Sequence, residues 1–452
     1  MPLREAFETW HGLLESDDLA AETAGRMEEE HRRRGMYFGD RALCTVLRPR
    51  FLTPEQYRWV RGRVQTLARA FGRAHERAVA DDAFRARFHL LDWEEELVRH
   101  DPGFPSPCPT SRPDAFYDSE AQTLRFTEFN AETPAAPAYM DVLSEVFLAL
   151  PVMREFLRTH VVHPLPARHG VLHALTGAFR SWSGTREAPR IGILDWADVP
   201  TYSEFVFFRD YFRAHGLECE IADPREVEYR GGRLLTAGGF HVTLIYKRVL
   251  IDELVLRMGM DSPVVRAVLD GAVCMVNPFR CKILYKKASL AVLSDERHAD
   301  LFTPDEREAI EAHVPWTRVV EERATAFHGE RVDLLPWAAE NRERLVIKPN
   351  DDYGGRGIVL GWLATADEWR AALATALESP HVVQERIVLP VEPFPSWEDG
   401  GVQVFDRMLD LAPFVTDGHG VNGALTRLAT DPLLNVTAGG GSSVATMLVE
   451  AR

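Results

Sequence analysis

The sequence lacks the features that mark several large classes of protein. It has no run of about 18 apolar residues, the length a membrane-spanning helix needs, and its first residues lack the apolar core of a secretory signal. Among 452 residues there are five cysteines, an odd number without CxxC spacing, so neither a zinc site nor a disulfide framework is expected. These absences predict a cytoplasmic protein with free thiols and no membrane segment.

Positive charge is also scarce. The formal net charge is −16, and no stretch of the chain is basic. Proteins that bind nucleic acids or anionic membranes present clustered Lys and Arg side chains, so neither partner is expected. The hydrophobic fraction of 46% and the charged fraction of 27% are typical of a soluble globular protein, and the length allows two or three domains.

The signature motifs of dinucleotide-binding folds, P-loop proteins, zinc proteases and serine hydrolases are absent too. Nucleotide chemistry in this chain would therefore need a different arrangement of residues.

The most informative stretch begins with apolar residues 345–347, which predict a buried strand, and continues with Lys348 and a glycine-rich loop at 354–357. Glycine permits positive φ angles and a close approach of the backbone to an anion, and a lysine reaches phosphate oxygens. Asp351 and Asp352 fit beside a polyphosphate only if a cation such as Mg²⁺ lies between them. Taken alone, the stretch fits nucleotide binding and an ordinary glycine-rich hairpin equally well.

A second stretch, residues 123–132, predicts a strand in which Glu128 and Asn130 share a face. Simple alternation places Leu124 and Phe126 on that same face. A carboxylate and an amide oxygen so placed at the end of a strand suit Mg²⁺. A half-solvated strand without a metal is the simpler interpretation of this pair alone.

Other segments predict the remaining organisation. Residues 101–114 carry five prolines and predict a linker. Residues 189–256 alternate strands and helices, which favours a parallel sheet with ligands at the C-terminal strand ends. Arg248 follows the strand expected at 241–246; a substrate contact and a surface pair with Asp252 or Glu253 remain open alternatives. Helices are expected at 5–14, 19–34, 54–79, 82–100 and 317–326, and a strand is expected at 381–388.

The order of these motifs resembles the circularly permuted ATP-grasp proteins, a group that includes glutathionylspermidine synthetase-like and eukaryotic glutathione synthetase-like ligases. The Glu-x-Asn pair precedes the glycine loop here, as permutation implies. The segments that carry the resemblance are 126–132, 244–248, 252–253, 284–288, 346–349, 353–357, 383–386, 423–428 and 439–442.

The resemblance implies a role for each matching residue. The lysines would contact ATP phosphates, the glycine loop would cover them, and a hinge would contact adenine. Three oxygen ligands would hold Mg²⁺, with the choice between Asp351 and Asp352 ambiguous. The phosphate-binding lysines would be Lys287 and Lys348, and the covering loop would be Gly354, Gly355, Arg356 and Gly357. The hinge would be Gln384, Glu385 and Ile387, and the Mg²⁺ ligands would be Glu128, Asn130 and Asp352. Arg427 and Arg248 would act on the reacting groups.

The fold implied is α/β (α+β): a circularly permuted ATP-grasp core with a helical N-terminal region and a Rossmann-like substrate subdomain. The expected parts are a helical region at 1–110, a metal-ligand strand with connecting helices at 111–188, a substrate subdomain at 189–262 and a nucleotide-binding domain at 263–452, which includes a second glycine loop at 438–443.

The activity implied is an ATP- and Mg²⁺-dependent carboxylate–amine ligase that works through an acyl phosphate. Its substrates would be a small acid and an amine, such as an amino acid, a peptide or a polyamine, and a homodimer is compatible with the resemblance. The alternatives are a kinase-like phosphotransferase on the same fold and a non-catalytic ATP-binding protein.

Overall fold

The N-terminal part of the chain is largely helical, as its apolar spacing predicts, but the helix predicted at 82–100 is divided into Asp82–Arg85, a 3-10 turn at Ala86–Phe88 and Asp92–Val98. The computed structural model describes residues 2–352, 354–430 and 441–452. A capping box starts the long helix α3, because the Thr53 side chain accepts from the Gln56 backbone N–H and the Gln56 side chain accepts from the Thr53 backbone N–H. The elements are α1 (Pro2–Leu13), α2 (Asp17–Arg34), β1 (Tyr37–Phe38), β2 (Arg41–Ala42), β3 (Arg50–Leu52), α3 (Pro54–Ala80), α4 (Asp82–Arg85) and α5 (Asp92–Val98).

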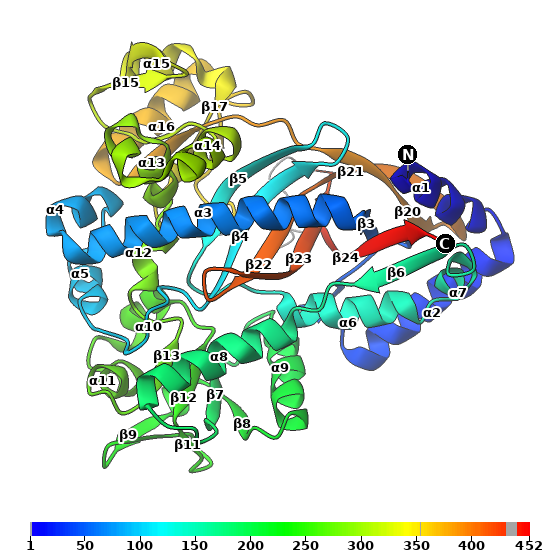
Figure 1. The fold of residues 1–452 in the computed structure, drawn as a ribbon, viewed down its shortest axis with the longest axis horizontal. Helices are drawn as coiled ribbons and strands as arrows, with labels where there is room; N and C mark the ends of the chain where they lie inside the picture. Colours follow the sequence, from blue (N-terminus) through cyan, green and yellow to red (C-terminus); the bar gives the residue numbers. More distant parts are fainter. Residues whose placement is uncertain (1, 353, 431–440) are drawn as a thin grey trace.

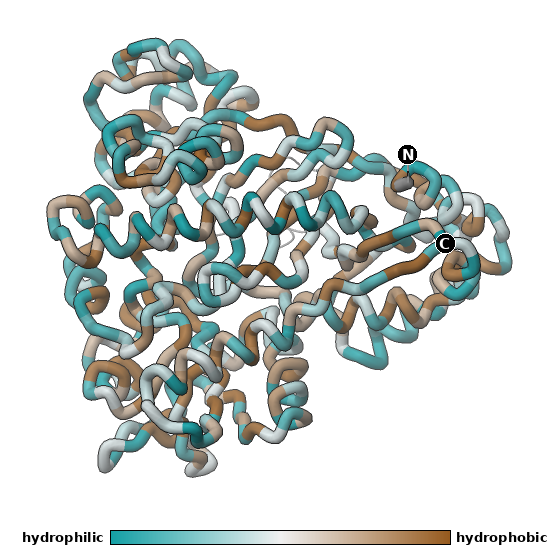
Figure 2. The backbone as a smooth tube through the Cα atoms, viewed as in Figure 1, coloured by the Kyte–Doolittle hydropathy of each residue, from teal (hydrophilic) through white to brown (hydrophobic). Residues whose placement is uncertain are grey.

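The largest sheet of the described chain runs through the middle of the molecule (Figure 1). Its strands follow the order β20-β21-β23-β22-β4-β5, and β24 pairs with β23, β3 and β6. Figure 2 colours β24 largely as apolar, in agreement with its buried Val444, Ala445, Met447 and Val449. The strands are β4 (Thr110–Asp118), β5 (Thr123–Asn130), β6 (His160–Pro164), β20 (Val391–Glu398), β21 (Gly401–Leu409), β22 (Ala412–Thr416), β23 (Gly420–Ala429) and β24 (Ser442–Ala451).

The predicted linker at 101–114 is wrong at its C-terminal end, because β4 begins at Thr110 and includes Pro113. A proline lacks the N–H that a ladder needs. Here β4 pairs with β22 at Thr110 and Ser111 and forms a bridge again between Ala115 and Leu411, so the ladder on that side is interrupted at Pro113.

The predicted alternation along β5 is also wrong beyond Phe126. Asp114 pairs with Glu128 while Ala115 pairs with Phe126, so Thr127 is an extra residue, a β-bulge. The bulge places Phe129, rather than Glu128, in the same buried core as Leu124 and Phe126. Glu128 and Asn130 consequently lie on the opposite face of the strand.

Residues 189–276 form the expected parallel sheet, in the order β13-β12-β7-β8. The strand predicted at 241–246 is split in two, because His241 and Val242 pair with a separate hairpin. The elements are β7 (Ile191–Leu194), α9 (Tyr202–Ala214), β8 (Cys219–Ala222), β9 (Glu228–Arg230), β10 (Arg233–Leu235), β11 (His241–Val242), β12 (Leu244–Lys247), α10 (Ile251–Met258), α11 (Pro263–Leu269) and β13 (Cys274–Val276).

The glycine-rich stretch belongs to an antiparallel sheet of order β14-β19-β17-β18. The helix predicted at 317–326 is wrong: β14 and β15 occupy this segment. Buried Arg318 disguises the strand pattern, and its guanidinium donates to Ser294 O at 2.9 Å and to Thr325 Oγ1 at 2.7 Å. The elements are β14 (Thr317–Val319), β15 (Ala324–Phe327), β16 (Glu330–Asp333), α15 (Leu334–Glu340), β17 (Leu345–Pro349), β18 (Val359–Leu360), α16 (Ala366–Glu378) and β19 (His381–Glu385).

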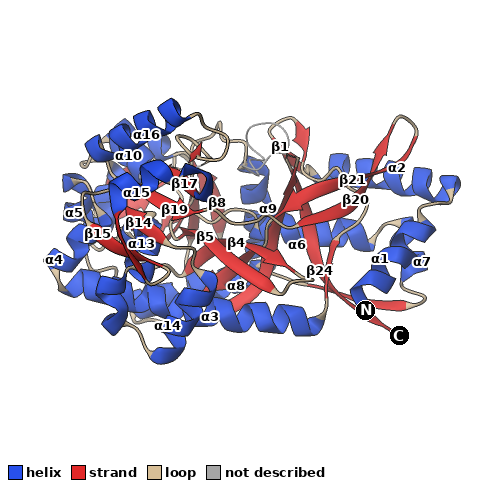
Figure 3. Ribbon diagram, turned by 90° about the horizontal axis from the view of Figure 1, so that it is seen from above, coloured by secondary structure: helices blue, strands red, loops and turns tan. Residues whose placement is uncertain are grey.

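The remaining helices connect and cover these sheets. From a second direction, Figure 3 shows α1, α2 and α7 at one end of the large sheet and α13 to α16 beyond the other. Within the residues described, no helix combines the length and apolar character needed to cross a bilayer. These helices are α6 (Pro137–Leu148), α7 (Pro151–Phe156), α8 (Arg168–Ser183), α12 (Cys281–Tyr285), α13 (Ala288–Ser294) and α14 (Pro304–His313), with short 3-10 turns at Ala86–Phe88, Pro224–Glu226, Glu296–Leu301 and Arg342–Arg344.

Candidate active site

A cavity between β5, β17, β19 and the glycine loop brings together residues that are far apart in the sequence. Glu128, Lys348 and Arg427 all line it. Its walls also include an apolar set on β17, β18 and the segment after β19, which matches the needs of a flat aromatic base. These apolar residues are Val346, Ile358, Leu360, Ile387 and Leu389.

The glycine loop has the backbone geometry that the sequence predicts. Gly354, Gly355 and Gly357 have φ angles of +68°, +78° and +67°, which other residues rarely adopt. At Gly357 a side chain is excluded for a second reason, since a Cβ atom would lie 2.6 Å from Pro349 Cγ. Gly354, Gly355 and the neighbouring Arg356 all line this cavity or the one beside it.

Lys348, at the end of β17, points into the cavity. Its Nζ donates to Gln384 Oε1 at 2.7 Å and to Thr127 O at 3.2 Å. Burial lowers the pKa of Lys348 to about 8, and the nearby Glu128 carboxylate acts in the opposite direction. Both hydrogen bonds leave the ammonium group beside the glycine loop.

Of the predicted metal ligands, Glu128 and Asn130 line the same cavity, and Asp352 approaches Glu128 through its backbone carbonyl. Lys287 joins two of them, because its Nζ is 3.0 Å from Glu128 Oε1 and donates to Asp352 O at 2.6 Å. The Asn130 amide Nδ2 donates to Arg112 O at 3.2 Å. Asn130 matters because, among the described residues, no three His, Cys, Asp or Glu side chains form a metal cluster by themselves.

Asp351 has a different environment from Asp352. Its carboxylate lies 3.0 Å from Lys282 Nζ and also contacts Lys286 Nζ. Burial would raise the pKa of Asp351, but these two lysines outweigh it and lower the pKa to about 2. The Asp351 carboxylate is thus committed to a buried ion cluster, which favours Asp352 as the third ligand.

Arg427 on β23 is held by two carboxylates that the sequence reading missed. Its Nη2 lies 2.6 Å from Asp114 Oδ2 and 2.6 Å from Asp410 Oδ2. Burial opposes the charge of Arg427, but the two acids outweigh it and raise the pKa. Asp114 also pairs with Arg112 at 2.8 Å. The charged residues at 112 and 114, inside a buried strand, could have indicated these partners, but the prolines around them predicted a linker instead.

The predicted adenine hinge lies at the end of β19. The Gln384 amide donates to Thr317 Oγ1 at 2.9 Å, and the Glu385 carboxylate lies 3.0 Å from His328 Nε2. Gln384, Glu385 and Ile387 all line the cavity. Beyond them, the Arg386 guanidinium lies 4.4 Å from the centre of the Trp362 ring.

Arg248 is not a surface residue, so the predicted alternative of a surface pair with Asp252 or Glu253 is wrong. It is 5% exposed, its Nη1 donates to Pro134 O at 2.7 Å, and its Nη2 lies 3.6 Å from Glu204 Oε2. Its place after a strand of the parallel sheet puts it in a second cavity.

This second cavity has a volume of about 500 Å³ and adjoins the first. The two share Asp114, Glu128, Gly354 and Arg427. The ends of the parallel strands reach it through Asp195 and Arg248. The two cavities therefore meet at Glu128, one of the predicted metal ligands. Residues 438–440 of the predicted second glycine loop lie outside the described residues, whereas Ser443 lines this cavity.

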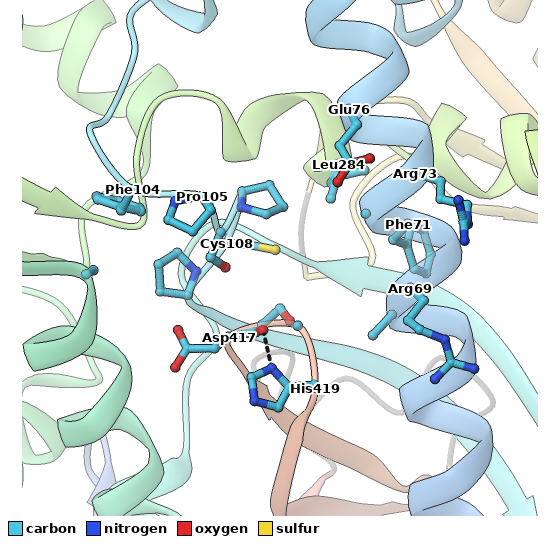
Figure 4. A pocket seen from close by; sticks show the side chains of 18 of the residues that line it. Arg69, Phe71, Arg73, Glu76, Phe104, Pro105, Cys108, Leu284, Asp417 and His419 are labelled. Atoms are coloured by element: carbon cyan, nitrogen blue, oxygen red, sulfur yellow. Dashed lines mark hydrogen bonds between the residues drawn. The ribbon is translucent and has the colours of Figure 1, made fainter. Parts of the chain in front are cut away.

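A separate cavity of about 660 Å³ lies on the other face of β5, against α3 (Figure 4). Proline-rich residues 104–109 and the turn at 417–419 line it, with His419 Nδ1 2.7 Å from Asp417 O. Its two arginines, Arg69 and Arg73, each pair with an acid of α14. Its described lining has neither a lysine nor a glycine-rich loop like that at 354–357.

No family model matches the chain. An uncharacterized protein of Mycobacterium leprae is 25% identical over 338 residues, 72% of this chain and 56% of the relative. Uncharacterized proteins of Mycobacterium bovis and Mycobacterium tuberculosis are 25% identical over 334 residues, 71% of this chain and 56% of each relative. The chain therefore spans about half the length of the curated relatives it matches.

Among solved structures, a glutathione synthetase-like effector from Globodera pallida in its apo form is similar in fold. The TM-score is 0.60, the match covers 98% of this chain and 96% of that chain, and the sequence identity is 13%. The predicted mixed α/β fold is confirmed, and it is similar to the fold of this effector. The circular permutation and the division into four parts stay predictions.

Proposed function

We propose that this protein is an ATP- and Mg²⁺-dependent ligase that joins a small carboxylic acid to an amine through an acyl phosphate. One observation carries the proposal: Glu128, Lys348 and Arg427 come from distant segments of the chain and line one cavity, which opens onto a second. A phosphate cradle, a candidate metal pair and a charged side chain for the transferred group are the parts that this reaction needs.

The residues present fit Mg²⁺. Glu128 and Asn130 offer a carboxylate and an amide, and Asp352 lies near them through Lys287. Magnesium usually takes one or two carboxylates and completes its shell with substrate phosphates and water. When bound, the ion would neutralise phosphate charge; Glu128, Asn130 and Asp352 would hold it.

In the first step, an oxygen of the substrate carboxylate attacks the γ-phosphorus of ATP, the new O–P bond forms, and ADP leaves. Lys287 and Lys348 bind the phosphate oxygens through their ammonium groups. Arg427, fixed between Asp114 and Asp410, binds the oxygens of the transferred group as their charge is redistributed.

In the second step, the amine nitrogen attacks the carbonyl carbon of the acyl phosphate. The C–N bond forms, the C–O bond to phosphate breaks, and a proton leaves the nitrogen. No protein nucleophile is required, which agrees with two cavities whose described lining offers one lysine, arginines and acids rather than a Ser–His or Cys–His pair. The shared position of the two cavities lets the amine reach the intermediate.

A phosphotransferase on the same fold would stop after the first step, and a non-catalytic protein would bind ATP without turnover. The test is a screen of amino acids, peptides and polyamines for ADP release, with mass detection of condensed products and hydroxylamine to trap an acyl phosphate. A ligase gives ADP, a hydroxamate and a condensed product that needs both substrates. A stable phosphorylated acid or alcohol, or no ADP release with any pair, would contradict the proposal.

A further inference from the structure

Several of the charged side chains that line the second cavity form ion pairs within the protein. Asp114 pairs with Arg112 and Arg427, and Glu128 pairs with Lys287. Most of the charge lining the cavity is thereby balanced inside the protein.

Asp195, which lines the same cavity, differs from these paired groups. It is 8% exposed and lines the cavity at the end of β7. One carboxylate oxygen accepts the backbone N–H of Trp196 at 2.8 Å, and no described cation lies within ion-pair distance of either oxygen. A buried carboxylate without a countercharge is costly, and burial accordingly raises the pKa of Asp195 to about 6.

A second acid makes this end of the cavity more negative. Glu253 on α10 lines the same cavity and acts on Asp195 in the direction that disfavours ionisation. Its carboxylate accepts the indole N–H of Trp196 at 2.7 Å and lies 3.9 Å from Arg257. Arg248 and Lys247 act on Asp195 in the opposite direction. Arg248 is committed to Pro134 O and Glu204, and Lys247 to Glu132 and Val249 O, so both balance Asp195 only from beyond ion-pair distance.

We propose that Asp195 binds a protonated primary amino group of the small-molecule substrate in this cavity, with Glu253 contributing negative potential. The substrate class is thereby an alkylammonium compound rather than an alcohol or an uncharged amide. This assignment rests on the proposed ligase function for its biological meaning, but the binding site itself is testable without turnover. An ammonium ion pairs with a desolvated carboxylate more strongly than a neutral hydroxyl does.

A conservative variant tests the negative charge of Asp195 without altering the fold. Asp195→Asn keeps an oxygen for the Trp196 N–H and nearly the same volume, and it removes only the negative charge. Asp198→Asn is the matched control, because Asp198 lies three positions later and is exposed. Unchanged ADP binding by both variants verifies that the neighbouring nucleotide cavity is intact.

The experiment is calorimetric titration of the full chain with 1,4-diaminobutane and with 1,4-butanediol, its uncharged counterpart. We expect the diamine to bind more tightly than the diol, and Asp195→Asn to weaken diamine binding by at least about tenfold while Asp198→Asn leaves it unchanged. Equal binding of diol and diamine, or an unchanged diamine affinity in Asp195→Asn, would overturn the assignment.

The outcome is separable from that of the ligase proposal. Diamine binding that depends on Asp195, together with no ADP release for any acid and amine pair, would refute the ligase and leave the ammonium site standing. Product formation with uncharged nucleophiles at full rate, together with no Asp195 dependence, would refute the ammonium site and leave the ligase standing.

Discussion

At the scale of single residues, Lys348 has a charge that depends on its surroundings. Burial lowers its pKa to about 8, so the side chain is protonated below that pH and loses its charge above it. ATP affinity is therefore predicted to fall as pH rises from 7 to 9. Lys348→Arg should flatten the profile, since an arginine stays charged over this range. Calorimetric ATP titrations at several pH values check this; a flat wild-type profile would contradict it.

The metal pair gives a second prediction at this scale. Glu128→Gln keeps the shape of the side chain but removes the charge that suits Mg²⁺, so turnover should fall by about 100-fold or more and more Mg²⁺ should be needed. ATP binding should change little. Glu120→Gln, in an exposed turn before the same strand, is the control. Steady-state ADP release against Mg²⁺ concentration measures the effect, and kinetics like those of the control would remove Glu128 from the site.

At the scale of elements, the glycine loop contains a matched pair of positions. Gly354 and Gly357 have nearly equal φ angles of +68° and +67°, but only at Gly357 would a Cβ atom meet Pro349, at 2.6 Å. Gly354→Ala should cost about 1 kcal/mol of strain, and Gly357→Ala should cost more and weaken ATP binding further. Thermal unfolding and ATP titration of both variants test this. Equal effects would mean that the loop shifts away from Pro349 without cost.

Strand β5 shows which structural features could not be predicted from the sequence. Its first residue and its acid–amide pair were predicted, whereas the strand ends at Asn130 rather than at residue 132, and the face of Glu128 was assigned with the wrong neighbours because of the Thr127 bulge. A bulge adds one residue to one strand, and nothing local to residues 123–130 distinguishes it from regular alternation. It depends on the partner strand β4, which the prolines of the preceding segment concealed. Asp114 and Asp410 were missed for the same reason: they matter only once β4, β22 and β23 lie side by side.

At the scale of the whole molecule, a buried ion cluster connects the parts around the site. Lys282 Nζ lies 3.0 Å from Asp351, 3.5 Å from Glu94 and 3.5 Å from Glu132. These acids come from the base of the glycine loop, from α5 and from the end of β5. The cluster therefore ties the N-terminal helix α5 to the end of β5 and to the segment before the glycine loop, a long-range arrangement that short sequence patterns do not contain.

Because only Asp351 belongs to this ion cluster, experiments can distinguish the roles of Asp351 and Asp352. Asp351→Asn removes one partner from a buried network, so the free energy of unfolding should fall by roughly 3 kcal/mol. Asp352→Asn should leave stability nearly unchanged and reduce turnover through the metal site. Denaturant unfolding and ADP-release kinetics of both variants provide the comparison. The reverse pattern would assign the metal to Asp351.

Much of the overall architecture was accessible from the sequence because it follows local rules: helix caps such as Thr53, the alternation that gives the parallel sheet, and the positive φ angles of the glycine loop. The pairing of distant strands was reached only through a resemblance of motif order. The helix expected at 317–326 failed because Arg318 is a buried charge that tertiary partners satisfy, and no local rule anticipates those partners.

The most direct measurement of the central claim uses a substrate acid found in the screen, labelled with ¹⁸O in its carboxylate. If an acyl phosphate forms and an amine displaces it, one labelled oxygen is carried from the carboxylate into the released phosphate. The account predicts labelled phosphate in proportion to the amide formed. Unlabelled phosphate accompanying the same product would contradict it.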